Sequence, residues 1–182
     1  MTTRRTFITA TTATLLTGAT MSDAMAETTA SNNLKMTLKY GDVTITLRPD
    51  LAPLAAERLR TLTAQGFYDG CKFFRVIAGF MAQTGDPTNT GTGGSQLPNL
   101  PAEFTQDASF LTGTVGMART QDPNSANSQF FICFDPCSWL DGQYTIVGQV
   151  TAGMDAVQQI KKGSGSSGSV QDPDAIIKMV VA

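Results

Sequence analysis

Arg75 is the residue of this chain whose surroundings best suit chemistry on a bound ligand. It lies in the segment Phe73–Asp86, which reads FFRVIAGFMAQTGD and which also contains Gln83 and the apolar pair Phe80 and Met81. A guanidinium is planar, always charged and able to hold two hydrogen bonds at once, so it can stabilise a polar group without moving a proton. A single arginine between aromatic residues is more often a surface residue with a partly buried stem. Whether Arg75 binds a ligand or is a surface residue therefore depends on the strands and loops that surround it.

The absence of histidine narrows the chemistry. The 182 residues include no histidine and three cysteines. Histidine is the usual general base near neutral pH and the commonest metal ligand, so Ser-His-Asp and Cys-His hydrolases are excluded. A zinc site would need several thiolates from Cys71, Cys133 and Cys137. The formal net charge is -2 and no basic cluster exceeds the pair Lys161-Lys162, which argues against nucleic acid as a partner.

The three cysteines are predicted to be small, partly buried apolar residues. Cys133 and Cys137 are four positions apart. If one extended strand ran through both, their Cα atoms would be too far apart for a disulfide. A turn at Asp135-Pro136 would leave a disulfide possible.

Residues 1–26 are predicted to be an export signal and not part of the fold. Arg4 and Arg5 directly precede the modestly apolar stretch 8–20, which is too short and too polar to be a stable membrane span. Ala24-Met25-Ala26 follows as a small-x-small cleavage pattern. This order resembles a bacterial twin-arginine signal and predicts a periplasmic or secreted protein. A disordered cytoplasmic N-terminus with a chance arginine pair is the alternative.

Residues 27–182 are predicted to form one mainly β domain, because the chain is long enough for one core and too short for two ordinary domains. Residues 34–39 and 43–48 alternate between apolar and polar, which predicts a hairpin. Pro53 and the apolar stripe after it predict a helix over 51–65. Further strands are expected at 73–77, 80–83, 113–118, 128–133, 145–150 and 176–181, with a second helix at 153–162. Such short strands favour one antiparallel barrel.

Three glycine-containing or irregular stretches join these elements. Residues 85–104 and 120–127 are expected to be functional, because loops of this length in a compact domain usually are. Gly91–Gly94, within the first, is expected to be structural, since no Gly-Lys-Ser/Thr follows it. Residues 163–169 are predicted to be a flexible Gly/Ser linker without chemistry.

Three ordered blocks of the sequence resemble the cyclophilin family. The first is Phe73–Asp86, the second is Met117–Thr120 followed by Asn124–Ile132, and the third is Trp139–Gly142 leading to Val147–Val150. The resemblance spans about residues 34–182. It implies a closed eight-stranded antiparallel β-barrel capped by two α-helices. It also implies peptidyl-prolyl cis-trans isomerase activity without a cofactor or a metal.

The resemblance also implies a set of site residues. Catalytic roles fall to Arg75, Gln83, Phe80 and Phe131, and substrate-binding roles to Met81, Ala118, Arg119, Gln129, Trp139, Leu140 and Tyr144. Gln83 would orient Arg75, and the main chain of Arg119 would pair with an extended peptide. Trp139 stands at the position associated with cyclosporin binding. Phe74 and Tyr144 stand where many members carry histidine, which should alter the efficiency without abolishing the activity.

The implied substrates are proline-containing segments of unfolded or partly folded exported proteins, and a monomer is expected. A proline-binding chaperone or adaptor with little turnover is the alternative. The presence of Arg75 together with Gln83 argues against it, because a module that only binds needs an apolar cup and not a group directed at nitrogen.

Overall fold

The computed structural model describes residues 31–182, so the predicted signal at 1–26 lies outside the described residues. The elements are β1 (Asn33–Leu38), β2 (Gly41–Leu47), α1 (Pro53–Ala64), β3 (Arg75–Ile77), β4 (Met81–Thr84), β5 (Thr114–Met117), β6 (Phe130–Cys133), the 3-10 helix η1 (Ser138–Leu140), β7 (Ile146–Ala152), α2 (Met154–Gln158) and β8 (Lys178–Val181). Every predicted strand and helix is present. The second helix is shorter than expected and ends at Gln158.

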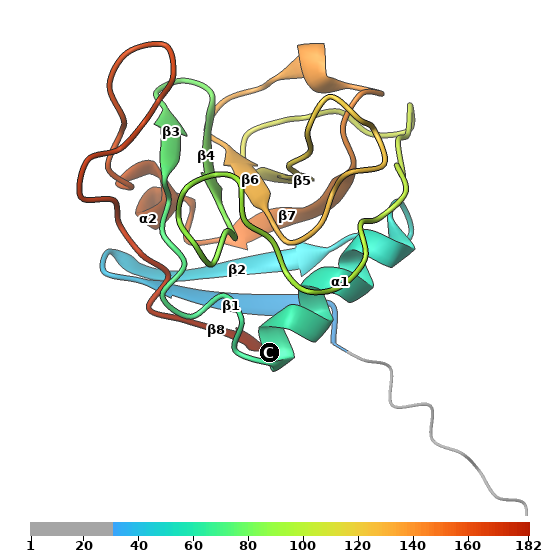
Figure 1. The fold of residues 1–182 in the computed structure, drawn as a ribbon, viewed down its shortest axis with the longest axis horizontal. Helices are drawn as coiled ribbons and strands as arrows, with labels where there is room; N and C mark the ends of the chain where they lie inside the picture. The colour runs from blue at the N-terminus through green and yellow to red at the C-terminus, as the bar shows by residue number, and fades with distance from the viewer. Residues whose placement is uncertain (1–30) are drawn as a thin grey trace, which may run out of the picture.

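The eight strands form one antiparallel sheet that curves around the main core (Figure 1). The strand order is β3-β4-β6-β5-β7-β2-β1-β8. The prediction of a closed barrel is wrong, because β3 and β8, the two ends of this order, form no ladder within residues 31–182. β3 has only three residues. The sheet is therefore an open half-barrel.

Irregular chain fills the gap between β3 and β8, and this is the physical reason why no ladder closes the sheet. Isolated bridges join Lys72 to Ala175 and Arg75 to Ser169. Pro173 lies between the two bridged residues Ser169 and Ala175, and proline has no N–H to donate to a ladder. This region between β3 and β8, which we call the seam, is thus hydrogen-bonded at single points and not along a continuous strand pair.

The Gly/Ser segment, residues 163–169, belongs to this seam and is not the free linker that its composition predicts. Figure 1 shows it, in red, beside β3. The amide of Val76 donates to the carbonyl of Gly168 at 2.7 Å, and the amide of Gly163 donates to the carbonyl of Val76 at 2.9 Å. The segment therefore covers the edge of β3 that β4 does not use.

The two faces of the sheet pack against different apolar clusters. Side chains alternate between the faces of a strand, so Ala82 and Ile132 point into the main core while Met81 and Phe131 point to the opposite face. There they join a second, smaller cluster with Phe110, Cys133, Cys137, Leu140 and Ile146. This outer cluster, built on β4 and β6, is the floor on which the candidate site lies.

Helix α1 begins with a cap supplied from a distant loop. Pro53 occupies its first turn, and the preceding Ala52 has no side chain able to cap. The amides of Leu54 and Ala55 instead donate to the two carboxylate oxygens of Glu103, at 2.9 and 2.8 Å. A negative charge at a helix N-terminus is favourable, and two otherwise unsatisfied amides gain acceptors. No helix in the described part of the chain is long and apolar enough to cross a membrane.

All three cysteines are buried and free, which confirms their prediction as small apolar residues. The chain bends after β6, and the thiol of Cys137 lies within 3.1 Å of the carbonyl oxygen of Asp135. Burial raises the pKa of Cys71 to about 11 and raises the pKa of both Cys133 and Cys137. The three side chains are therefore thiols, not thiolates, near neutral pH.

Candidate active site

Strand register places three of the four candidate catalytic residues, Arg75, Gln83 and Phe131, in one row on the outer face of the sheet. Arg75 of β3 lies opposite Gln83 of β4, and Gln83 lies opposite Phe131 of β6. Residues directly opposite each other in an antiparallel pair point to the same face. Met81 is two residues before Gln83 and shares that face. The first and second sequence blocks therefore meet side by side.

The guanidinium of Arg75 is held by three neutral groups. Its Nε donates to the carbonyl of Ser167 at 3.1 Å, and its Nη1 donates to Oε1 of Gln83 at 3.2 Å. Nη1 also lies 3.9 Å from the sulfur of Met81. Among residues 31–182 no carboxylate forms a salt bridge with Arg75, and its Nη2 has no hydrogen-bond partner. The positive charge is thus fixed in position and not neutralised.

Gln83 connects Arg75 to a chain of amide hydrogen bonds. Its Nε2 donates to Oε1 of Gln129 at 2.9 Å. The Nε2 of Gln129 in turn donates to the carbonyls of Gly91 and Gly93, at 3.1 and 2.8 Å. These bonds leave each amide group one orientation that satisfies its donors and acceptors. Gln83 therefore presents oxygen, not nitrogen, to Arg75.

An apolar cup of about 150 Å³ lies beside this row. It is lined by Arg75, Phe80, Met81, Gln83, Ala118, Arg119, Phe131, Leu140 and Tyr144. Phe131 forms the floor, stacked on Phe110 at 5.8 Å between ring centroids. Gly116 of β5 makes this packing possible, because a Cβ there would lie 2.4 Å from the Phe131 ring. The cup thus sets apolar side chains beside Arg75, Gln83 and Arg119, a combination that suits one small ring joined to a polar backbone.

The rim of the cup carries aromatic and cationic side chains. Tyr144 meets Phe131 edge to face at 5.9 Å, and the guanidinium of Arg119 lies 4.4 Å from the Tyr144 ring centroid. Arg119 also donates to the carbonyl of Gln143. Its own main-chain N–H and carbonyl have no hydrogen-bond partner within the described residues. Trp139 stands outside the cup wall, with its ring 5.6 Å from that of Phe80.

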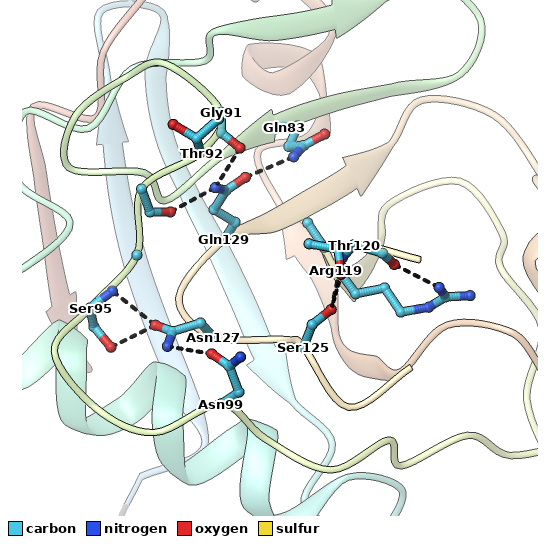
Figure 2. A pocket seen from close by; sticks show the side chains of 13 residues that line it. Gln83, Gly91, Thr92, Ser95, Asn99, Arg119, Thr120, Ser125, Asn127 and Gln129 are labelled. Carbon is cyan, nitrogen blue, oxygen red and sulfur yellow. Dashed lines mark hydrogen bonds between the residues drawn. The ribbon is translucent and has the colours of Figure 1, made fainter. Parts of the chain in front are cut away.

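A second cavity, the polar pocket, opens on the other side of Gln83 and Gln129. Figure 2 shows the two glutamines at its wall, with Ser95, Asn99 and Asn127 on one side and Arg119, Thr120 and Ser125 on another. Its volume is about 480 Å³. Oδ1 of Asn127 accepts from the amide and hydroxyl of Ser95, at 2.8 and 2.7 Å. The two long irregular stretches of the sequence thus form the walls of one pocket.

Buried Asp86 holds the glycine-rich side of the polar pocket in shape. Its carboxylate accepts from the amides of Thr88, Gly91 and Gly93, at 2.7, 2.6 and 3.1 Å. Desolvation of the buried carboxylate by itself raises its pKa, but the hydrogen bonds from Thr88, Gly93 and Gly91 outweigh it and lower the pKa of Asp86 to about 2. An ionised Asp86 therefore fixes the carbonyls of Gly91 and Gly93 against Gln129.

The structure brings together all the site residues that the sequence predicts. All of them line the cup except Gln129, which lines the polar pocket, and Trp139, which stands on the rim. Sequence reasoning missed Ser167 and Asp86, and it assigned Gly91 and Gly93 only to a structural loop. Asp86 could have been found, because an aspartate followed by Thr, Gly and Asn residues is typical of a side chain that accepts from its own loop. Nothing in the sequence points to the Ser167 carbonyl.

The family model of the cyclophilin type peptidyl-prolyl cis-trans isomerases matches residues 33–181. This match spans nearly the whole described chain, so the protein belongs to the cyclophilin family. The predicted peptidyl-prolyl cis-trans isomerase is thereby confirmed. The twin-arginine signal stays a prediction.

Individual relatives agree with the family match. Proteins described as probable peptidyl-prolyl cis-trans isomerases in Brucella suis and Brucella abortus are 53% and 52% identical to this chain. Each match covers 82% of this chain and 82% of the relative. A crystal structure of a Cryptosporidium parvum cyclophilin in the presence of the dipeptide Ala-Pro has a TM-score of 0.75 at 29% identity. It covers 82% of this chain and 98% of that one. A cyclophilin from Hirschia baltica has a TM-score of 0.74 at 26% identity and covers 83% of this chain and 74% of its own.

Proposed function

We propose that this isomerase acts on X-Pro bonds of exported polypeptides and that Arg75 is its principal catalytic residue. The observation that carries the assignment to Arg75 is its position at the edge of the apolar cup, held by neutral acceptors and without a carboxylate partner among the described residues. A charge fixed in this way is available to a substrate.

The reaction needs a fixed charge because the barrier is electronic. Delocalisation of the nitrogen lone pair into the carbonyl gives the peptide bond a rotational barrier of about 18–20 kcal/mol. Uncatalysed X-Pro exchange takes tens of seconds or longer. As the bond twists, the nitrogen becomes pyramidal and its lone pair is localised. A donor that meets this lone pair binds the twisted state more strongly than either planar state.

Arg75 is the donor that the geometry offers. With Nε on Ser167 and Nη1 on Gln83, its Nη2 is the free edge of the guanidinium. A guanidinium can also hold the substrate carbonyl at the same time. Every further 1.4 kcal/mol of stabilisation specific to the twisted state is worth about a factor of ten in rate. No proton is transferred and no covalent bond to the enzyme is formed.

The surrounding residues hold the substrate while the bond turns. Phe80, Met81, Phe131 and Leu140 grip the pyrrolidine ring in the cup, and the free main chain of Arg119 pairs with the extended peptide. The polar pocket receives a polar side chain next to the proline. The Ala-Pro dipeptide of the Cryptosporidium parvum structure supports a proline-containing ligand for this kind of fold.

Three further properties complete the proposal. The twin-arginine sequence at Arg4 and Arg5 directs the chain to a periplasmic or secreted location, where it acts as a monomer on unfolded or partly folded proteins. The exposed rim at Trp139 binds a cyclosporin-type inhibitor. These properties rest on the sequence motifs and on the position of Trp139 beside Phe80.

A proline-isomer exchange assay on a short peptide tests the role of Arg75. Arg75→Ala should lower kcat/KM at least about tenfold, equivalent to a loss of about 1.4 kcal/mol of transition-state stabilisation. Arg48→Ala is the matched control, because it removes an arginine that is paired with Asp50 outside the cup. Circular dichroism should show both variants folded.

The same assay separates the isomerase from a proline-binding chaperone. An enzyme loses turnover in Arg75→Ala while it still binds the peptide in the cup. Equal activity of the wild type and Arg75→Ala would remove Arg75 from the mechanism. A wild type that binds proline peptides without accelerating exchange would support the chaperone.

A further inference from the structure

We propose that Ser167 and Gly168, within the Gly/Ser segment 163–169, position Arg75, and that Gly168 sets the place of the Ser167 carbonyl. This inference rests on the proposed catalytic role of Arg75. It assigns a function in the reaction to a segment whose composition alone suggests a passive linker.

The first step is the attachment of the segment to β3. Val76, the residue after Arg75, uses both of its main-chain groups to bind the segment: its N–H donates to Gly168 at 2.7 Å and its carbonyl accepts from Gly163 at 2.9 Å. The segment is closed on itself by the amide of Ser164, which donates to the carbonyl of Ser169 at 3.1 Å. The loop is therefore registered against β3 at the position of the catalytic side chain.

The second step is the contact with the guanidinium itself. The carbonyl of Ser167 accepts from Nε of Arg75 at 3.1 Å, from the side away from Gln83. The guanidinium is thus fixed at two of its nitrogens by two oxygens from different elements. With one of these oxygens alone, the planar group could turn about the remaining bond. Both acceptors are needed to hold the guanidinium in one orientation at the edge of the cup.

The third step is the requirement for glycine at 168. Its φ is +69°, a backbone conformation that residues with a side chain rarely adopt. Its backbone is also buried against β3, so a Cβ would lie 2.4 Å from Cγ1 of Ile77 and 3.0 Å from the carbonyl oxygen of Val76. A larger residue therefore requires the Ile77 side chain or the segment itself to shift, and the close contact with the Val76 backbone favours a shift of the segment. The adjacent carbonyl of Ser167 would move with it.

The chain supplies a matched control in the same segment. Gly165 has a φ of +65°, nearly the same as Gly168, but a Cβ there would have no neighbour within 4 Å. Alanine introduces similar backbone strain at either position. Only Gly168→Ala also forces the segment away from β3, so the difference between the two variants reports the displacement.

The main test compares Gly168→Ala and Gly165→Ala in a peptide isomerisation assay that resolves kcat from KM. Gly168→Ala should lower kcat at least about fivefold, because misplacing a reacting group by about 1 Å can reduce a rate about 100-fold. Its KM should stay within about twofold of the wild type, since the apolar residues Met81, Phe131 and Leu140 that hold the ring stand on β4, β6 and η1. Gly165→Ala should keep both constants. A merely structural role would reduce the folded fraction and leave kcat per folded molecule unchanged.

A second substitution tests the cause. Ile77→Ala removes the Cγ1 atom nearest to the new methyl group, so the double variant Gly168→Ala/Ile77→Ala should recover part of the lost kcat relative to Ile77→Ala alone. Failure of Ile77→Ala to restore any kcat in this cycle would contradict displacement of the segment as the cause.

A spectroscopic measurement on the wild type keeps the proposal testable even if Gly168→Ala does not fold. The Nε–H signal of Arg75, assigned by its loss in Arg75→Lys, should be shifted and slow to exchange with water, and Gly168→Ala should abolish both properties. An Nε–H that exchanges as fast as in a free arginine peptide overturns the positioning role. So does a wild-type kcat in Gly168→Ala when Arg75→Ala is impaired. A fully active Arg75→Ala would instead disprove the catalytic role of Arg75, on which this inference rests.

Discussion

Trp139 is the only tryptophan of the chain, and the residue is 58% exposed. Its ring stands at the rim of the cup beside Phe80. Its indole N–H has no hydrogen-bond partner among the described residues. An exposed apolar ring with a free donor suits a bulky, mainly apolar ligand that also offers a carbonyl.

At the residue scale, we predict that cyclosporin inhibits the wild type and that Trp139→Ala weakens this inhibition at least about tenfold, equivalent to about 1.4 kcal/mol. Peptide isomerisation should change much less, because Trp139 does not line the cup. The measurement is an inhibition curve for each variant with the same peptide. A wild type that cyclosporin does not inhibit would contradict the proposed rim contact.

At the scale of single residues, the sequence predicts contacts that lie within one motif and misses those made by the main chain. Arg75 and Gln83 meet because a tight turn pairs β3 with β4, and both residues stand in the same 14-residue block. The contact of Arg75 with Ser167 spans 92 positions and uses a carbonyl. Every residue carries a carbonyl, so residue type gives no signal for it.

Elements depend on long-range contacts in the same way. The stripe of apolar residues after Pro53 predicts α1 well, because the period of the helix is visible in the sequence. The cap of α1 is not visible, since Glu103 reaches the amide of Leu54 from 49 positions away. The loop 86–93 is the opposite case, because Asp86 binds amides only two to seven positions ahead of it.

The element-scale prediction concerns this loop. Asp86→Asn should destabilise the protein by about 1–3 kcal/mol at pH 7, because an amide nitrogen would replace a carboxylate oxygen that accepts from the partly buried amides of Gly91 and Gly93. It should also lower the activity, since these residues orient Gln129 and through it Gln83. Urea denaturation measures the first effect and the isomerisation assay the second. Asp107→Asn, at an exposed position, is the control.

The pH dependence of this stability difference gives an independent check. The folded state holds the pKa of Asp86 at about 2, below the ordinary aspartate value. The ionised carboxylate therefore stabilises the folded state above the ordinary pKa, and this contribution is lost as the pH falls toward 2. The gap between the wild type and Asp86→Asn should be constant from pH 5 to 7 and narrow steadily below about pH 4. A gap that widens in acid would contradict the hydrogen-bonded carboxylate.

At the scale of the whole molecule, the number of strands and their positions along the chain could be predicted, but the closure of the barrel could not. Alternating runs predict each strand separately. Whether the sheet closes depends on the few hydrogen bonds between residues 70–76 and 168–176, a stretch containing Pro173 and two glycines in left-handed conformation, Gly70 and Gly168. Such a seam has no periodic pattern from which to predict it.

Export of the whole chain is predicted to depend on the arginine pair. Arg4→Lys with Arg5→Lys preserves the charge but removes the pair that a twin-arginine receptor reads, so the precursor should accumulate in the cytoplasm. Cell fractionation with detection of the precursor and of the form cleaved after Ala26 measures this. The same substitutions should leave the isomerase activity of the purified chain unchanged. Normal export of the double variant would indicate another route.

The final prediction is that kcat/KM stays nearly constant from pH 6 to 8 and does not respond to chelators. Proton-transfer catalysis gives a bell-shaped profile set by an essential acid and base. This chain has no histidine, and the pKa shifts of its carboxyl groups and thiols are directed away from neutrality. The pKa values of five carboxyl groups, Asp42, Asp50, Asp69, Asp86 and Asp174, are lowered, while burial raises those of all three thiols.

Neither kind of shift brings a titration into the range of the assay, and an arginine guanidinium stays charged throughout it. The measurement is kcat/KM for one peptide at half-unit steps of pH, with and without a chelator, at constant ionic strength. Constant ionic strength matters because salt screens the field of Arg75 at an open site. A steep inflection near pH 7 that persists after replacement of Cys71, Cys133 and Cys137 would require a proton-transferring carboxyl group. The conjugation-weakening mechanism at Arg75 would then be wrong.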